Sequence, residues 1–193
     1  MPLTKNQKIM ATGQLKVLQK LNPYEFGVKL WLMREGVNRN RWSYQNLEKY
    51  YKTFVGRPIL IAYVMGKIGD GHNHQLKTDP RTGAQYYSYT DGTAERIVGT
   101  LSDDERDFSL QKRDGQTWIV ARGKLFAFYA KETVDEIVRT GRMDVSVETL
   151  IDENHMDGDI EVEDVWSGVG VTILGTGVAP AIPGANIARL AAL

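Results

Sequence analysis

The stretch Gly141-Arg142-Met143-Asp144-Val145-Ser146-Val147-Glu148-Thr149 is the part of the sequence that best predicts how this chain folds. The residues before it, from Tyr129 to Thr140, carry apolar side chains at helical spacing, and a glycine at 141 is typical of a helix C-terminus. The alternation that follows is typical of a strand, which turns successive side chains to opposite faces. The segment therefore predicts a helix followed by a strand, and one face of that strand carries a serine between two carboxylates.

The sequence upstream of this helix predicts mostly strands. Apolar residues alternate between Gly13 and Met33 and are interrupted by Asn22-Pro23, which predicts a hairpin. Residues 47–54 have helical spacing, and we expect the hydroxyl of Ser43 to cap the first turn of that helix. The short apolar run from Ile59 to Met65 predicts a strand that is buried on both faces.

The middle of the chain combines irregular and strand-like sequence. Residues 66–93 are rich in Gly, Asp, Asn, Thr and Tyr without a sustained period, so we expect a long loop. A strand over 97–101 follows, and then a hairpin around Asp114-Gly115, because both residues of this dipeptide tolerate positive φ. In the helix from 129 to 140 we expect three side chains to point inward, namely those of Val134, Ile137 and Val138.

This order of elements predicts mostly β structure with two or three helices, so the fold class is either α+β or a barrel decorated by helices. A chain of 193 residues, 42% hydrophobic and 25% charged, suits one compact domain, which we assign to residues 1–180. Residues 181–193 are expected to form a C-terminal tail. This tail could begin a helix at Pro183 but is too short to pack much.

Composition excludes several classes of function. Lys+Arg and Asp+Glu both total 24, so the net charge is zero and we expect no direct contact with nucleic acid. The chain has no cysteine, which excludes disulfides, thiol nucleophiles and thiolate zinc sites. The sequence contains neither a membrane-spanning apolar run nor the apolar core of a signal peptide, so we expect a cytosolic protein without a membrane partner.

Ser146 and the histidines of Gly71-His72-Asn73-His74 are the residues best suited to catalysis. A serine hydroxyl is a weak nucleophile unless a base takes its proton and a third group orients that base. Either histidine could be the base, and Glu148 could orient it. The two histidines could instead bind a metal together with nearby carboxylates, but such a site needs three or four convergent ligands. We therefore expect no metal and no cofactor.

Six short motifs follow one another in a recognisable order between about residue 37 and residue 185. They are Val37-Asn38-Arg39-Asn40-Arg41-Trp42, Phe54-Val55-Gly56-Arg57-Pro58-Ile59, Gly71-His72, Arg96-Ile97-Val98-Gly99, Val145-Ser146-Val147-Glu148 and Val178-Ala179-Pro180-Ala181-Ile182-Pro183-Gly184-Ala185. This order resembles that of the capsid maturation (prohead) proteases of tailed phages, which are similar in fold and catalytic logic to the herpesvirus assemblin proteases. The resemblance implies that the barrel is antiparallel, closed or partly closed and assemblin-like.

The resemblance also implies roles for individual residues. Ser146 corresponds to the nucleophile and His72 to the general base, with His74 as the fallback. Relatives carry the third member of the triad on the strand before the Pro-Ala segment, but residues 171–178 contain neither an acid nor a histidine. The orienting residue is therefore expected to be Glu148, and the alternatives are Asp164, His155 or a working dyad.

By this resemblance, the chain is expected to be a serine endopeptidase that cleaves head proteins during phage maturation. Its substrates would be the major capsid protein and the scaffold protein, inside the immature prohead in the host cytoplasm. Residues 1–180 would be the protease domain, and residues 181–193 the remnant of a linker to a scaffolding segment. Homo-oligomer formation is left open. The alternative is a non-catalytic head-assembly or scaffolding module that keeps the protease fold.

Overall fold

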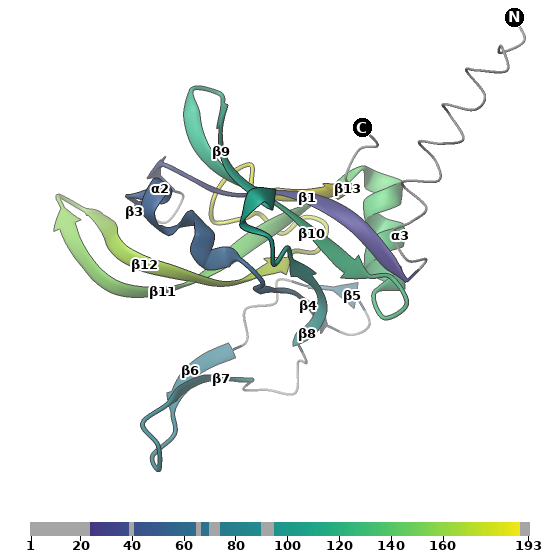
Figure 1. Cartoon of the computed structure of the whole chain (residues 1–193), viewed down its shortest axis with the longest axis horizontal. Helices are drawn as coiled ribbons and strands as arrows, with labels where there is room; N and C mark the ends of the chain where they lie inside the picture. The colour runs from purple at the N-terminus through teal and green to yellow at the C-terminus, as the bar shows by residue number, and fades with distance from the viewer. Residues whose placement is uncertain (1–23, 39–40, 65–66, 70–73, 90–94, 190–193) are drawn as a thin grey trace, which may run out of the picture.

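The computed structural model describes residues 24–38, 41–64, 67–69, 74–89 and 95–189. Within these residues, seven strands form a closed barrel in the order β12-β11-β13-β1-β10-β8-β4 (Figure 1). Their bounds are β1 Glu25–Arg34, β4 Pro58–Val64, β8 Glu95–Leu101, β10 Gln116–Phe126, β11 Arg142–Asp157, β12 Ile160–Ile173 and β13 Asn186–Arg189.

The barrel closes where β4 pairs with β12, and in the described residues this is its one parallel pairing. The other six pairings around the ring are antiparallel. The predicted α+β class with mostly β structure is therefore confirmed, and the barrel is closed. The expectation of an antiparallel barrel is wrong at one place, because β4 and β12 run parallel where the barrel closes. Closure leaves none of the seven strands with an open edge along its barrel segment, which fixes their register relative to one another.

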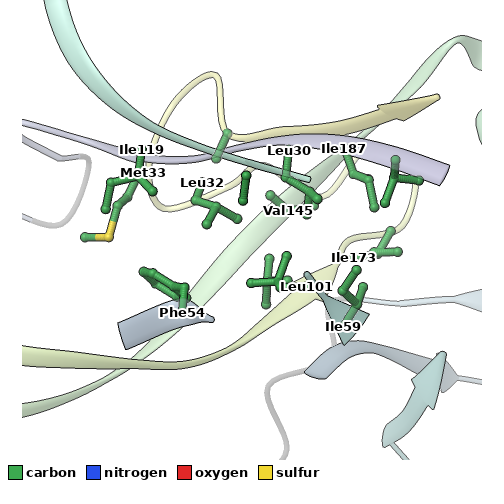
Figure 2. Close-up of a cluster of buried hydrophobic side chains, with 14 of the residues drawn as sticks. Leu30, Leu32, Met33, Phe54, Ile59, Leu101, Ile119, Val145, Ile173 and Ile187 are labelled. Carbon is green, nitrogen blue, oxygen red and sulfur yellow. The ribbon is translucent and has the colours of Figure 1, made fainter. Parts of the chain in front are cut away.

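Alternate side chains of the barrel strands fill its interior (Figure 2). Val145 of β11 is opposite Ile173 of β12, and both are fully buried. Leu30 of β1 is opposite Ile187 of β13, also fully buried. Because successive strand residues point to opposite faces, the neighbours of these core residues lie on the outside of the barrel. Ser146 is one of these outward-facing residues.

The remaining elements extend or cover the barrel. Strand β3 pairs with β12 beyond the closed part of the barrel, β2 pairs with β3, and β5 pairs with the end of β4. Strand β9 forms a hairpin with β10, and helices α2 and α3 precede β4 and β11. Their bounds are β2 Gly36–Val37, β3 Trp42–Tyr44, β5 Lys67–Ile68, β9 Phe108–Arg113, α2 Leu47–Tyr50 and α3 Lys131–Thr140, with 3-10 turns η1 Tyr51–Phe54 and η2 Glu105–Asp107. The predicted strands at 59–65 and 97–101 are confirmed as β4 and β8 over their described residues, and so is the 108–121 hairpin, with Asp114 and Gly115 at positive φ.

Two details of the predicted helices are wrong. Ser43 does not cap the first helix, because it lies within β3, and the residue at the helix start is Asn46 in a left-handed conformation. In α3, Ile137 is fully buried as predicted, whereas Val138 is 58% exposed. Gly141 ends α3 at φ 80, as the sequence indicates.

The prediction of a long loop over residues 66–93 is partly wrong. It contains β5 and a separate two-stranded sheet of β6 His74–Thr78 and β7 Gln85–Tyr89, which projects from the barrel (Figure 1). Hydrogen bonding in the turn between β6 and β7 explains why these two strands pair. Asp79 Oδ1 accepts a hydrogen bond from the Arg81 amide at 2.8 Å, and Gly83 adopts φ +71.

The expected tail also differs from the structure. Residues 186–189 form β13, a strand of the barrel, and Ile182, Ala185 and Ile187 are buried. Residues 181–189 are therefore part of the packed domain, and no helix begins at Pro183. Of the hairpin expected from Gly13 to Met33, the second strand is present as β1, and the first lies outside the described residues.

The β11–β12 hairpin continues past the barrel as a long two-stranded arm (Figure 1). We call residues 151–165 the arm. Strand β3 pairs with the β12 side of this arm. Among the described residues, no helix is both long enough and apolar enough to cross a membrane.

Candidate functional site

Ser146 lies near the start of β11, on the outer face of the barrel and directly opposite Thr172 of β12. Its side chain is half-buried, and within the described residues its hydroxyl makes no hydrogen bond. Most strand serines bond to their surroundings, as Thr172 does here. Strand β11 therefore fixes the position of Ser146, while its hydroxyl makes no hydrogen bond to the described residues.

Glu148 lies two residues beyond Ser146 and is only 7% exposed. The Thr172 hydroxyl donates a hydrogen bond of 2.5 Å to Glu148 Oε1 and lies 3.0 Å from Oε1 of Glu95, a β8 residue that is 8% exposed. One buried hydroxyl thus joins two carboxyl groups from different strands. A buried carboxylate needs such partners, because burial without hydrogen bonds is costly.

A glycine on β12 makes room for the Glu148 side chain. Gly170 is opposite Glu148, and a Cβ added to it would lie 3.0 Å from Glu148 Oε2 and 3.1 Å from a methyl of Leu60. The carboxylate therefore lies flat across the strands, on the same face as Ser146 and Thr172. Sequence alternation predicted that Ser146 and Glu148 share a face, but it did not indicate that Thr172 would hold the glutamate.

The histidines predicted as bases are only partly described. His72 lies outside the described residues, and His74 is the first residue of β6. The last described residue before His72 is Gly69, whose carbonyl accepts a hydrogen bond of 2.9 Å from the Gly175 amide. The adjacent Leu174 amide donates to the Asp144 carbonyl, also at 2.9 Å. Backbone hydrogen bonds thus connect the segment before His72 to the start of β11.

His155 and Asp164, two further candidates for the orienting role, lie on the arm. His155 Nδ1 and Asp164 Oδ2 are 2.6 Å apart, and their side chains are 53% and 31% exposed. His155 follows Ser146 by nine residues along one strand, which corresponds to about 30 Å. The structure therefore brings these two residues to each other and not to Ser146.

A cleft of about 380 Å³ opens beside the start of β11. Asp144, which precedes Ser146 by two residues on the same strand, contributes to one wall. The segment that follows β12 contributes the rest, together with two residues of β11 and β13; these lining residues are Arg142, Gly177, Val178, Ala179, Pro180, Pro183, Gly184 and Asn186. An open cleft of this kind, lined by a loop segment beside two strands, suits an extended peptide.

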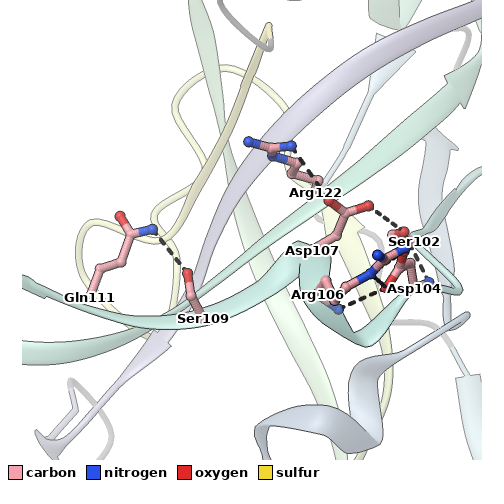
Figure 3. A network of polar contacts seen from close by, with 7 residues as sticks. All are labelled: Ser102, Asp104, Arg106, Asp107, Ser109, Gln111 and Arg122. Atoms are coloured by element: carbon pink, nitrogen blue, oxygen red, sulfur yellow. Dashed lines mark hydrogen bonds and ion pairs between the residues drawn. The ribbon is translucent and has the colours of Figure 1, made fainter.

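A second cleft, of about 460 Å³, lies over β8 and β10. Its polar groups satisfy one another: Asp107 accepts a hydrogen bond of 2.7 Å from the Ser102 hydroxyl and lies 3.5 Å from Arg122 Nη1 (Figure 3). Lys124 is similarly paired with Glu25 at 2.7 Å. The Ser102 hydroxyl is thus already bonded to a carboxylate, whereas that of Ser146 makes no hydrogen bond within the described residues.

In the part of the chain that the structure describes, no group of three or more His, Asp or Glu side chains could hold a metal ion. The side chains of His72 and His74 do not belong to that part. The chemistry available from the described residues is therefore that of a serine hydroxyl, a buried carboxyl pair and an open cleft.

Comparison with known proteins identifies the family. The chain belongs to the family described as the YonD N-terminal domain, whose model matches residues 24–192. The family is phage-associated, which indicates a phage protein. No curated protein and no solved structure matches the chain.

Proposed function

We propose that this member of the YonD N-terminal domain family is a serine endopeptidase that processes head proteins of its phage. Ser146 attacks the peptide carbonyl, His72 takes its proton and passes it to the leaving amine, and Glu148 orients the histidine. Backbone amides stabilise the oxyanion. The substrates are the major capsid protein and the scaffold protein, processed within the immature prohead.

The observation that carries the proposal is the state of the Ser146 hydroxyl. It is half-buried, has no hydrogen-bond partner among the described residues, and follows the cleft residue Asp144 on the same face of β11. A nucleophile needs both a fixed position and a free hydroxyl. The Thr172 hydroxyl next to it is buried and already bonded, so it cannot serve.

The backbone connections before His72 support its role as the base. His72 follows Gly69 by three residues, so covalent geometry limits the separation of their Cα atoms to about 11 Å. Gly69 is itself hydrogen-bonded to Gly175, next to the residue that binds the Asp144 backbone. This limit is compatible with the proposed contact between His72 and β11.

Glu148 suits the orienting role because it is buried, shares a face with Ser146 and is fixed by Thr172. In a catalytic triad the carboxylate sets the tautomer of the histidine and stabilises its charged form. Asp164 and His155 cannot do this from the arm.

Substitution of the nucleophile tests the proposal. Ser146→Ala should stop processing of co-expressed capsid and scaffold proteins, a loss of about 10³-fold or more. The matched control is Ser167→Ala, which removes a half-buried serine from the neighbouring strand β12. A serine-directed phosphonate reagent should also add its mass to Ser146 in the wild-type protein.

Other outcomes would overturn the proposal. Unchanged processing by the Ser146→Ala protein would indicate the alternative function, a non-catalytic head-assembly module. Processing that stops with a chelator but not with Ser146→Ala would indicate a metal-dependent hydrolase using His72 and His74.

A further inference from the structure

We propose that Arg113 is a positioning residue that fixes the wall of the cleft at Asp144, two residues before Ser146, by holding the carbonyl of Gly184. Its role in peptide cleavage rests on the proposed function, whereas its role in ordering the cleft does not. Arg113 ends β9, far from Ser146 in sequence, and belongs to none of the motifs that indicate catalysis.

The guanidinium of Arg113 contacts two tryptophans. Its Cζ atom lies 3.8 Å from the ring centroid of Trp118 and 4.4 Å from that of Trp31. The two rings are 6.0 Å apart at an interplanar angle of 84°. A planar guanidinium stacks on aromatic faces while its edge remains available for hydrogen bonds, which an ammonium group cannot do. The tryptophans thus set both the position and the direction of the donor.

That donor binds the loop before β13. Arg113 Nη2 donates to the Gly184 carbonyl at 2.8 Å, and Asn186 Nδ2 donates to the same oxygen at 2.7 Å. Gly184 has φ +94, and a Cβ there would lie 2.7 Å from Arg113 Nη2. Two donors, from β9 and β13, therefore hold one carbonyl at a position whose positive φ favours glycine.

The same loop forms a wall of the cleft. Pro183, Gly184 and Asn186 line it, and Asn186 is paired with Asp144 across β13 and β11. Movement of the Gly184 carbonyl would therefore move the wall relative to Asp144, two residues from Ser146. Arg113 connects the β9–β10 hairpin to this wall, and this is how it can affect substrate binding without touching substrate.

Hydrogen exchange and kinetics on Arg113→Lys test this inference. Lysine keeps the positive charge but lacks the planar guanidinium that contacts the tryptophans and donates to the Gly184 carbonyl. Amides of residues 178–186 should therefore exchange about tenfold faster, as expected for the loss of one hydrogen bond. The KM for a cleaved peptide should rise several-fold while kcat changes little, because the wall binds substrate and does no chemistry. Arg113→Gln provides a second variant, and Lys112→Met, on the exposed face of the same strand, is the control.

The two readouts separate this inference from the proposed function. Unchanged exchange in both Arg113 variants would overturn it, whatever the enzymology shows. Faster exchange with an unchanged KM would also overturn it, because the wall would then not affect binding. If the wild-type protein cleaves nothing, the proposed function fails, and the exchange rates still decide whether Arg113 orders the loop. Circular dichroism and the melting temperature establish that the variants compared are folded.

Discussion

The two halves of the β11–β12 hairpin have similar residues in different surroundings. In the barrel half, Glu148 is 7% exposed and bound to Thr172, whose hydroxyl also contacts Glu95 of β8. In the arm, the acid Asp164 is 31% exposed, and its histidine partner is 53% exposed. The barrel half is paired with β13 and β4, whereas the arm is bordered by β3 and by the residues on either side of it, Arg41, Gln45 and Asn46.

The comparison indicates that surroundings, rather than residue types, decide where chemistry is possible. His155 and Asp164, both alternatives for the orienting role, form an acid–histidine pair on the arm. An exposed ion pair is screened by water and contributes about 0–1 kcal/mol. A buried carboxylate in a fixed position has far stronger effects on its neighbours. The barrel half therefore provides a precise site, and the arm does not.

Of the substitutions that test this difference between the two halves, Glu148→Gln should have the largest effect on activity. The amide keeps the shape of the side chain and can still accept from Thr172, but it cannot stabilise a charged histidine. We expect kcat on a peptide substrate to fall by about 10³–10⁴-fold with little change in KM.

Asp164→Asn is the matched control for Glu148→Gln, because it makes the same chemical change on the arm. It should leave kcat unchanged. Full activity in Glu148→Gln combined with loss of activity in Asp164→Asn would reverse the assignment of the two acids.

Local sequence signals predicted a large part of the fold and only one part of the site. The Asp114-Gly115 turn, β4 and the α3–β11 junction were predictable because a few adjacent residues determine them. Strand β13 was missed because it has only four residues and exists through its pairing with β1 and β11. Position along the strand likewise predicted that Ser146 and Glu148 share a face.

The rest of the site depends on contacts between residues distant in sequence. Thr172 is 24 positions from Glu148 and 77 from Glu95, so no local pattern indicates that it joins them. Arg113 is 71 positions from Gly184. The sequence does contain a signal for Thr172, which is a polar residue in the apolar run 171–174. Its partners could not be predicted, because they lie on other strands and meet it through the closed barrel.

Replacing a glycine in each half tests whether the two halves also differ in how tightly they are packed. A Cβ on Gly168 would lie 2.5 Å from ring atoms of Phe54, which is fully buried, so Gly168→Ala should destabilise the fold by about 3 kcal/mol. At the arm tip, Gly158 has φ +64 with nothing within 4 Å of a Cβ. Asparagine tolerates this conformation, so Gly158→Asn should change stability by less than about 0.5 kcal/mol. Urea unfolding measures both, and equal losses would contradict the distinction.

The base of the arm should show its own pH dependence through Tyr44. Its hydroxyl is 2.8 Å from Thr149 Oγ1, and burial is the main cause that raises the pKa of Tyr44 from 10.0 to about 12. The folded protein thus keeps this proton where the unfolded chain loses it, so stability falls as pH rises from about 10 to 12.

Measurement of the free energy of unfolding at pH 9 and pH 12 tests this effect. Wild type should lose about 2 kcal/mol more than Tyr44→Phe over this interval, because phenylalanine has no proton to lose. Other tyrosines titrate in both proteins and cancel in the difference. Identical losses in the two proteins would mean that Tyr44 ionises freely and that the base of the arm is open to water.

The smallest expected effect is that of His155→Asn. The substitution removes the contact with Asp164, and because both side chains are substantially exposed, stability should fall by less than about 1 kcal/mol. Peptide cleavage should be unchanged, since about 30 Å of strand separates this residue from Ser146. Urea unfolding and kcat/KM provide the two measurements. A tenfold loss of kcat/KM without unfolding would show that the arm takes part in the reaction, and the contrast between the two halves of the hairpin would then fail.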